Sequence, residues 1–511
     1  MDLIKLKNFK SFKDETEFEL APITILTGKN NSGKSSLLKA LLLLDDFLDS
    51  ENQTVLSFLG KNQHKHKINR FENAKNWTND NQKIEFTYHN YKLSTHLVFG
   101  GSNENDFAFL ESCEIKSDIL NDSLIIKRLS STQIELKISQ RFINAIIQPQ
   151  ITGNRENKEL STLLEQFVQQ KKALKQKISK AKPDVLKELL SQTQAIEQRI
   201  KLLQESIRER SRKSSEEDQI YNPVIDIEEL DFPSLTIPNL VRLSLMLYFQ
   251  TDSEENKYTS NRSVRVGLMR LSDLLQTRLS FKTVHLSPNR THQSRLYFKR
   301  NSYSEINEII NLLARKPVRV GTTEDQFLKK WLKKFEIGED IRIKSVEGSA
   351  SSLEVLSKKR WINLADKGFG AGQILSILIL ITNMIREFSM RKGNRIRRTP
   401  LILIEEPESN LHPDLQAQLT ELFFDAYKVA GLRFVLETHS EYLIRKIQLM
   451  VAKDNGIDSD SALIYYLGNE DEGIRKISIL PNGKMSEPFG RGFVDEADRM
   501  AMELFKLNNK K

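Results

Sequence analysis

Eight consecutive residues near the N-terminus have the types and spacing of a phosphate-binding loop. Residues 28–35 read Gly-Lys-Asn-Asn-Ser-Gly-Lys-Ser, which fits the pattern G-x-x-x-x-G-K-[ST] after an apolar strand and before a helix. Glycines let the backbone wrap around phosphate with its N–H groups pointing inward, and the start of the helix adds partial positive charge. The alternative interpretation is an ordinary glycine-rich turn, which would not require the strand, the helix and the complete pattern together. The residues expected to contact the phosphates of ATP are Gly28, Asn30, Asn31, Ser32, Gly33, Lys34, Ser35 and Ser36.

Within this loop the last two residues carry the chemistry. Lys34 would bridge the β- and γ-phosphates, and the hydroxyl of Ser35 would ligate Mg²⁺.

Two adjacent carboxylates follow a short apolar segment late in the chain. The aliphatic run 401–404 leads into Glu405 and Glu406, and Pro407 ends the strand. Adjacent carboxylates on a surface strand are usually solvated, but a buried strand makes its acidic end costly unless the charges are paired. We expect Glu405 to hold magnesium or its water, and Glu406 to orient or deprotonate the attacking water.

A histidine stands at the end of another apolar strand. His439 follows the segment 434–436, so it would lie on the same sheet edge as the acidic pair. A lone histidine is a structural residue by default. In this order of motifs we expect it to contact the γ-phosphate.

These motifs need a sheet that brings distant segments together. Apolar strands are predicted at 23–26, 401–404 and 433–436, and the helix 35–47 is apolar almost all round, as in the first crossover of an α/β sheet. We therefore predict one sheet built from both ends of the chain, with the rest inserted. The further elements expected are strands at 84–88, 93–98, 124–129 and 133–138 in an antiparallel subdomain, helices at 240–248 and 266–275, and a strand at 283–286.

A lysine-rich segment reads as two helices. Between Arg155 and Arg212 there is no glycine, and Pro183 divides two runs with apolar residues at heptad spacing. We predict an antiparallel helical hairpin that projects from the body. Its basic face fits a solvated arm as well as a nucleic-acid contact. The second basic cluster that could hold a polyanion is Arg391, Lys392, Arg395, Arg397 and Arg398.

The expected organisation has four parts. Residues 1–150 form the N-terminal lobe with the phosphate loop and the β subdomain, and 151–218 form the hairpin. Residues 219–360 connect to a C-terminal lobe at 361–511.

Composition limits the class of protein. The chain has 511 residues, one cysteine (Cys113) and a net charge of +9, and its longest apolar stretch, 374–384, contains polar residues. We expect a protein of the reducing cytoplasm without a membrane span, and the charge favours an acidic partner such as nucleic acid.

Taken in order, these motifs resemble the ABC-type ATPases of the soluble branch that contains SMC proteins, RecF and the OLD family. Residues 4–12 look like the first strand and turn of that branch, 409–413 are similar to its D-loop, and His439 matches its switch histidine. The segment 363–373 stands in the place of the ABC signature. The resemblance implies an α/β, P-loop head with a mixed sheet that binds ATP as a homodimer. Each chain would complete the partner's site through Gly370, Gly372 and Gln373.

Four segments indicate a smaller group within this branch. They are 286–290, 368–373, 405–408 and 492–496. They look like a bacterial group of stand-alone ATPases from anti-phage operons, first the PtuA type of Septu and retron systems and then the AriA type of PARIS. This implies a separate effector subunit, often a nuclease. OLD proteins carry a nuclease domain after the switch histidine, whereas about seventy residues follow His439 here, so we expect no nuclease in this chain.

Two departures from the group pattern bear on turnover. Gly372 stands where a serine normally donates to the γ-phosphate, and Glu405 replaces the usual aspartate of ABC proteins. The Q-loop glutamine could be Gln53, Gln63 or Gln82. Two alternatives stay open: a repair or chromosome-maintenance ATPase of RecF or SMC type, and a scaffold that uses ATP only to hold a dimer together.

Overall fold

The structure is a computed structural model of the chain. It describes residues 1–118, 122–151, 167–172, 174, 193–202, 204, 220–228, 233–251, 262–288, 294–298, 305–346, 349–390, 400–453, 457–469, 472–489, 499, 500, 502, 503, 505 and 506.

A six-stranded sheet forms the middle of the molecule, in the order β12-β17-β18-β3-β19-β20. All neighbours are parallel except the β19–β20 pair. The strands are β3 (Ile23–Gly28), β12 (Thr283–Leu286), β17 (Leu401–Glu405), β18 (Arg433–Glu437), β19 (Ala462–Leu467) and β20 (Ile474–Ser478). The predicted sheet from both ends of the chain is confirmed. It also takes its edge strand β12 from the middle of the sequence, which the prediction had placed in the insertion.

The sheet divides the interior into two cores, because successive side chains of a strand point to opposite faces. In β17, Leu403 packs into the core with α1 and the N-terminal β subdomain, whereas Ile402 and Ile404 pack into the core with α11 and α12. This two-sided burial explains why the strands are apolar without alternation. The helices are α1 (Lys34–Asp49), α9 (Glu305–Arg315), α10 (Thr323–Lys334), α11 (Phe369–Met390), α12 (Pro413–Ala430) and α13 (Glu441–Ala452).

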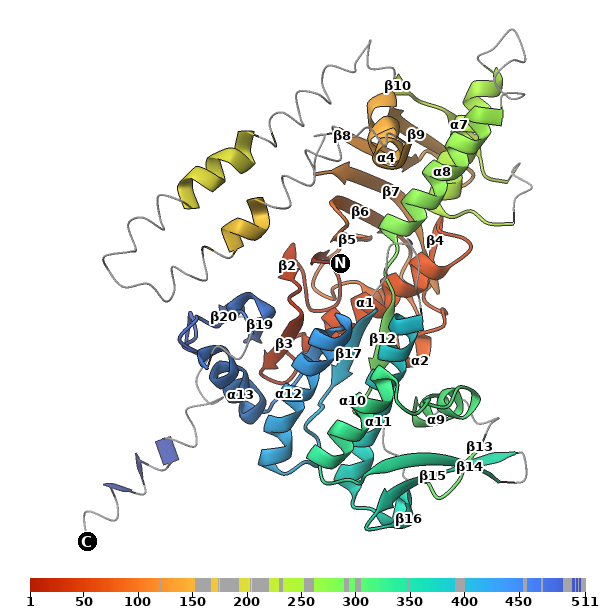
Figure 1. Cartoon of the computed structure of the whole chain (residues 1–511). Coiled ribbons are helices and arrows are strands. Elements are labelled where there is room, and N and C mark those ends of the chain that lie inside the picture. Colours follow the sequence, from red (N-terminus) through yellow and green to blue (C-terminus); the bar gives the residue numbers. More distant parts are fainter. Residues whose placement is uncertain are drawn as a thin grey trace.

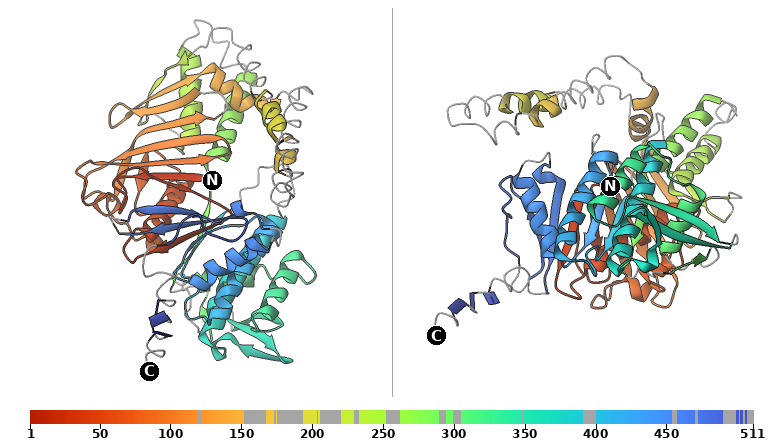
Figure 2. Two further views of the ribbon diagram at one scale, coloured as in Figure 1. Left: turned by 90° about the vertical axis from the view of Figure 1, so that its left-hand side faces the viewer. Right: turned by 60° about the horizontal axis from the view of Figure 1, so that its bottom comes forward.

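A ten-stranded antiparallel sheet covers the α1 side (Figures 1 and 2). Its strands run in the order β10-β9-β8-β7-β6-β5-β1-β2, with β11 on β9 and β4 on β7. The strands are β1 (Leu3–Lys7), β2 (Thr16–Glu19), β4 (Val55–Ser57), β5 (Lys83–Asn90), β6 (Leu93–Gly100), β7 (Phe107–Ser117), β8 (Asp122–Arg128), β9 (Gln133–Ser139), β10 (Ile220–Tyr221) and β11 (Val224–Asp226). The predicted antiparallel subdomain is confirmed.

Shorter elements complete the described fold. The helices are α2 (Gln63–His66), α3 (Phe71–Ala74), α4 (Gln140–Ile151), α7 (Ile237–Thr251) and α8 (Arg262–Leu279). The 3-10 turns are η1 (Leu364–Asp366) and η2 (Ser459–Ser461). A small sheet joins β13 (Tyr297–Phe298), β14 (Asp340–Val346), β15 (Ala350–Ser357) and β16 (Arg360–Asn363), and it lies at the end of the molecule opposite α7 and α8 (Figure 1).

The predicted hairpin is described only in part. Residues 167–172 and 193–202 are helical, Lys171 pairs with Glu197 at 2.9 Å, and Arg199 lies 5.8 Å from the ring centre of Phe167. The later residue of the first helix thus meets the earlier residue of the second, as in two antiparallel helices. The rest of the segment, including Pro183, lies outside the described residues, as do the basic cluster 391–398 and the tail 492–496.

One helix in the described part of the chain, 369–388, is long and apolar enough to cross a membrane by length and composition. It is 83% buried inside the protein, because α11 packs between α9, α10 and α12. Its apolar character is accounted for by the core.

Candidate functional site

The loop between β3 and α1 has the backbone that its glycines make possible. Gly28 has φ 128° and Gly33 has φ 99°, values that side chains with a Cβ rarely adopt. A Cβ at Gly28 would overlap the carbonyl oxygen of Leu467, and one at Gly33 would overlap the hydroxyl of Ser11. The loop therefore curls tightly in front of the N-terminus of α1, as a phosphate cradle requires.

Lys34 lies inside this loop. Its side chain is buried, and Nζ donates to the carbonyl oxygens of Gly28 at 3.2 Å and Lys29 at 2.5 Å. Burial lowers the pKa of the Lys34 ammonium, while the nearby carboxylates of Glu437 and Glu406 act to raise it. The ammonium is thus a cation held at the inner rim of the cradle by backbone oxygens that a phosphate could replace.

The hydroxyl of Ser35 meets a carboxylate that sequence reasoning missed. Ser35 Oγ donates to Glu437, at 3.1 Å to Oε1 and 2.9 Å to Oε2, whereas Glu405 was expected at this position. Burial, followed by the charge of the adjacent Glu405, raises the pKa of Glu437 to about 7. The reason is strand order: β18 lies directly beside β3, and β17 lies one strand further away. An acidic residue two positions before His439 in the sequence was the available clue.

Glu405 forms a different contact. Its Oε1 lies 2.7 Å from Nε2 of His285, which is almost fully buried at the end of β12. Nδ1 of the same histidine lies 3.7 Å from Glu305, whose other oxygen accepts the backbone N–H of Ser287 at 2.8 Å. Glu405 is also the cross-strand neighbour of Glu437. It therefore stays beside Glu437 while His285 fixes its direction.

Glu406 stands at the turn after β17. Its φ is 44°, its N–H donates to the carbonyl oxygen of Glu437 at 2.7 Å, and its side chain is exposed. Ser409 Oγ donates to its Oε2 at 2.8 Å. The carboxylate of Glu406 thus contacts Ser409, whereas that of Glu405 contacts His285.

His439 lies near the same loop. Burial, then the charge of Lys34, lowers the pKa of His439, and the charge of Glu406 acts in the opposite direction, so the imidazole lies within electrostatic range of both side chains. The backbone N–H of His439 donates to Glu408 Oε1 at 2.7 Å. The structure therefore brings Lys34, Glu406, Glu437 and His439 together at the carboxyl ends of three neighbouring parallel strands.

The glycine-rich segment before α11 contacts the turn after β17. A Cβ at Gly370 would lie 3.1 Å from Leu411 Cδ2 and 3.2 Å from the Asn410 carbonyl oxygen. Gly372 and Gln373 are buried inside the helix layer, with Gln373 only 1% exposed. Both residues were expected to face a partner's nucleotide, and the structure does not present them on the surface. Of Gly370, Gly372 and Gln373, only Gly370 is partly exposed, beside the turn after β17.

The remaining expected residues of the loop fall into two groups. Asn30 and Asn31 are exposed, and Ser32 Oγ donates to the Lys29 carbonyl oxygen at 2.7 Å, so Ser32 holds the loop shape. The Ser36 hydroxyl accepts from Ser11 Oγ at 3.1 Å, which fixes the turn after β1 against α1.

Two of the three Q-loop candidates have side-chain contacts elsewhere. Gln53 bridges the Leu48 carbonyl oxygen and the Ile237 N–H, and Gln63 donates to Asn69.

The donor set fits a nucleotide with magnesium. The glycine cradle offers backbone N–H groups, Lys34 offers a cation, and Ser35, Glu437 and Glu405 offer oxygen ligands of the kind that Mg²⁺ prefers. In the described part of the chain no group of three or more His, Cys, Asp or Glu side chains is arranged to hold a metal by itself. This suits Mg²⁺, which is normally bound by one or two protein oxygens together with phosphates and water.

Comparison with known proteins identifies a family. The family model described as AAA ATPase domain matches residues 1–444. Among solved structures, the Smc head domain with an extended coiled coil bound to the C-terminal domain of ScpA, from Pyrococcus furiosus, is 12% identical, with 98% of each chain covered and a TM-score of 0.35. The SMC head domain from Thermotoga maritima is 10% identical, with 96% of this chain and 98% of that chain covered and a TM-score of 0.33. No curated protein matches the sequence.

Proposed function

The chain belongs to the AAA ATPase domain family, and on that premise we propose that it binds Mg²⁺ and ATP at the β3–α1 loop and hydrolyses the ATP. The observation that carries this proposal is the convergence of Lys34, Ser35, Glu437, Glu406 and His439 at one sheet edge. A structural ion-pair cluster would not need a glycine cradle facing it.

Each residue has a task in this scheme. Lys34 and the loop N–H groups hold the phosphates, and Ser35 with Glu437 and Glu405 would hold Mg²⁺, which supplies charge neutralisation on the phosphate oxygens. Glu406 accepts a proton from the attacking water, and Ser409 fixes one of its oxygens. His439 would donate a hydrogen bond to the terminal phosphate.

We further propose that ATP joins two copies of the chain. The support is the exposed start of α11, where Phe369 is 47% exposed and Gly370 packs on the Asn410 turn that follows Glu406. A second copy placed against this surface would contact the turn that positions the catalytic carboxylate. Because Gly372 and Gln373 are buried, the contact would come from the backbone at 368–370.

We propose that this ATPase regulates a separate effector protein in bacterial anti-phage defence. Nuclease activity is the first activity to test in that effector. The support is the resemblance of its motifs to the PtuA and AriA types. Expressed from its native gene neighbourhood, the system should protect against phage, and Lys34→Ala should remove protection. Protection retained by that variant, or a neighbourhood of repair genes with sensitivity to DNA damage on deletion, would favour a RecF- or SMC-type role instead.

One observation favours the scaffold alternative, in which ATP is bound and not turned over. The side-chain donor usual at position 372 is absent, and the glycine there is buried. ATP-dependent dimerisation without phosphate release by the wild-type protein would establish that alternative.

A further inference from the structure

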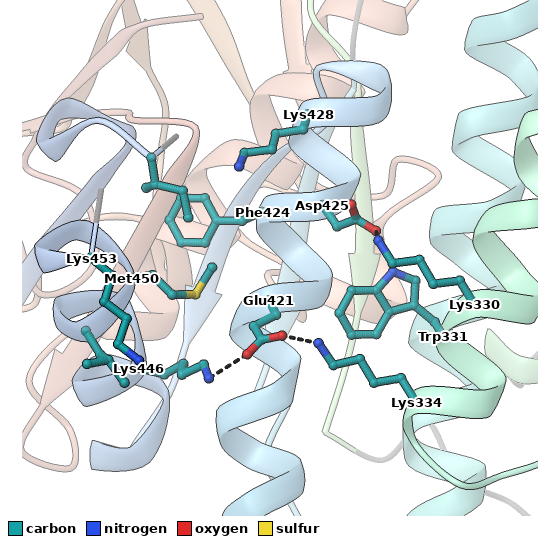
Figure 3. Close-up of a pocket in the computed structure, with 12 residues that line it drawn as sticks. Lys330, Trp331, Lys334, Glu421, Phe424, Asp425, Lys428, Lys446, Met450 and Lys453 are labelled. Carbon is teal, nitrogen blue, oxygen red and sulfur yellow. Dashed lines mark hydrogen bonds and ion pairs between the residues drawn. The ribbon is translucent and has the colours of Figure 1, made fainter. Parts of the chain in front are cut away.

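Five lysine side chains surround a cavity of about 370 Å³ between α10, α12 and α13. Figure 3 shows α12 in the middle, with Glu421, Asp425 and Lys428 on it and the other helices on either side. The lysines are Lys330 and Lys334 of α10, Lys428 of α12, Lys446 of α13, and Lys453 directly after α13. We call this feature the lysine cavity. It is separate from the ATP site.

The two carboxylates of α12 hold three of these ammonium groups in place. Glu421 pairs with Lys334 and, at 2.5 Å, with Lys446, and Asp425 pairs with Lys330 at 2.7 Å (Figure 3). An ammonium group has three N–H donors, so one ion pair leaves it able to bind a second oxygen. The acidic residues therefore position the lysines without using up their donors.

The cavity keeps an excess of positive charge. Among the described residues that line it, five ammonium groups against two carboxylates leave an excess of three. The C-terminal ends of α12 and α13 lie at Lys428 and Lys453 and subtract about half a charge each, which leaves about two. The cavity therefore favours an anionic ligand that carries more than one negative charge within a short distance.

The aromatic side chains of the lining limit which anion fits. Trp331 is 1% exposed and Phe424 is 2% exposed, and the indole N–H of Trp331 already donates to Asp425 at 2.7 Å. Their ring faces are covered, so a nucleobase has no aromatic surface on which to stack, and stacking is what single-stranded nucleic acid normally requires. A phosphate backbone needs only the ammonium groups.

We propose that the lysine cavity binds the phosphodiester backbone of double-stranded DNA without reading its sequence. The net charge of +9 on the whole chain supports such a partner. The cavity also has a defined relation to the ATP site, since α12 begins after the Asn410 turn and α13 begins after His439. DNA held here would contact the two helices that continue from the catalytic loops.

The test compares two double variants of equal charge change. Lys428→Gln with Lys453→Gln removes two exposed cations of the cavity, and Lys127→Gln with Lys137→Gln removes two exposed cations from strands β8 and β9. Binding of a fluorescent 30-base-pair duplex is followed by anisotropy from about 50 to 200 mM KCl. Circular dichroism and ATP turnover without DNA show that each variant is folded.

The cavity variant should bind the duplex about tenfold or more weakly at 100 mM KCl, with a salt slope smaller by about 1.8, for two contacts of about 0.9 each. The β8–β9 variant should bind within about twofold of wild type. Equal losses in both variants, or an unchanged cavity variant, would overturn the proposal. Tighter wild-type binding to single-stranded DNA of the same length, or to a 20-residue polyglutamate peptide, would also overturn it, and the peptide result would assign the cavity to an acidic protein segment.

Discussion

The hydroxyl of Ser35, at the start of α1, donates to both carboxylate oxygens of Glu437, at the end of β18. This contact joins the phosphate loop to the strand that leads into His439. It places a carboxylate directly beside the loop, with Glu405 as its cross-strand neighbour. In the proposed function, Mg²⁺ would therefore lie beside the acidic ends of these two neighbouring strands.

This relationship predicts an order of effects for two conservative variants. Glu437→Gln should raise the Mg²⁺ concentration needed for half-maximal phosphate release by about 10- to 100-fold, as expected for a group that ligates or orients at a metal site. Glu405→Gln should raise it less, because one oxygen of that carboxylate already pairs with His285. A Mg²⁺ titration of both variants decides the order. A larger effect in Glu405→Gln would restore Glu405 as the principal ligand.

Nucleotide binding should depend on Lys34 and not on its neighbour in the loop. Lys34→Ala removes charge-assisted hydrogen bonds worth about 1.5–3 kcal/mol each, so binding of labelled ATP should fall at least tenfold. Lys29→Ala is the matched control, because Lys29 Nζ points to Glu472 at 3.1 Å. Wild-type affinity in folded Lys34→Ala would show that this loop is not the phosphate site.

Glu408 should act as a positioning residue for His439. Its Oε1 accepts the His439 N–H at 2.7 Å, and burial raises the pKa of this carboxyl group. Glu408→Leu should lower kcat about tenfold while ATP affinity stays near wild type, because the removed contact fixes the histidine loop. Glu408→Gln keeps the acceptor oxygen and should restore most of the rate. Equal loss in both variants would mean that the charge, and not the hydrogen bond, matters.

The sequence was sufficient for the parts of the fold that repeat a local pattern. The strand–loop–helix around residues 28–35, the strands β17 and β18 and the antiparallel subdomain follow from glycine spacing, apolar runs and alternation, and the structure contains all of them. Helix α1 begins at Lys34 and ends at Asp49, one or two residues beyond the expected limits.

Pair contacts between strands could not be predicted in the same way. The partners Ser35–Glu437 and Glu405–His285 depend on the order β12-β17-β18-β3, which is set by tertiary packing. The burial of Gln373 is likewise a property of the α11 surroundings, since its local sequence is that of an exposed glycine-rich turn. Sequence patterns give the elements, and the sheet order decides which side chains meet.

We predict that the purified chain leaves nucleic acids intact. Plasmid, single-stranded DNA and transfer RNA are incubated with Mg²⁺ or Mn²⁺ and ATP, and products are separated on gels. In the described residues no group of three or more His, Cys, Asp or Glu side chains could hold a nuclease metal, while Asp495 and Glu496 lie outside them. Cleavage that survives Glu406→Gln but is lost in Asp495→Asn or Glu496→Gln would place a nuclease site in the tail.

Whether this chain is an ATPase whose general base is Glu406 is decided by phosphate release and sedimentation of Glu406→Gln with Mg²⁺ and ATP. The amide keeps the shape of the side chain and its contact with Ser409 but cannot accept the proton of water. We predict ATP affinity within about twofold of wild type, phosphate release lower by about 100-fold or more, and a dimer that persists with ATP. Phosphate release at the wild-type rate by this variant would show that Glu406 is not the general base.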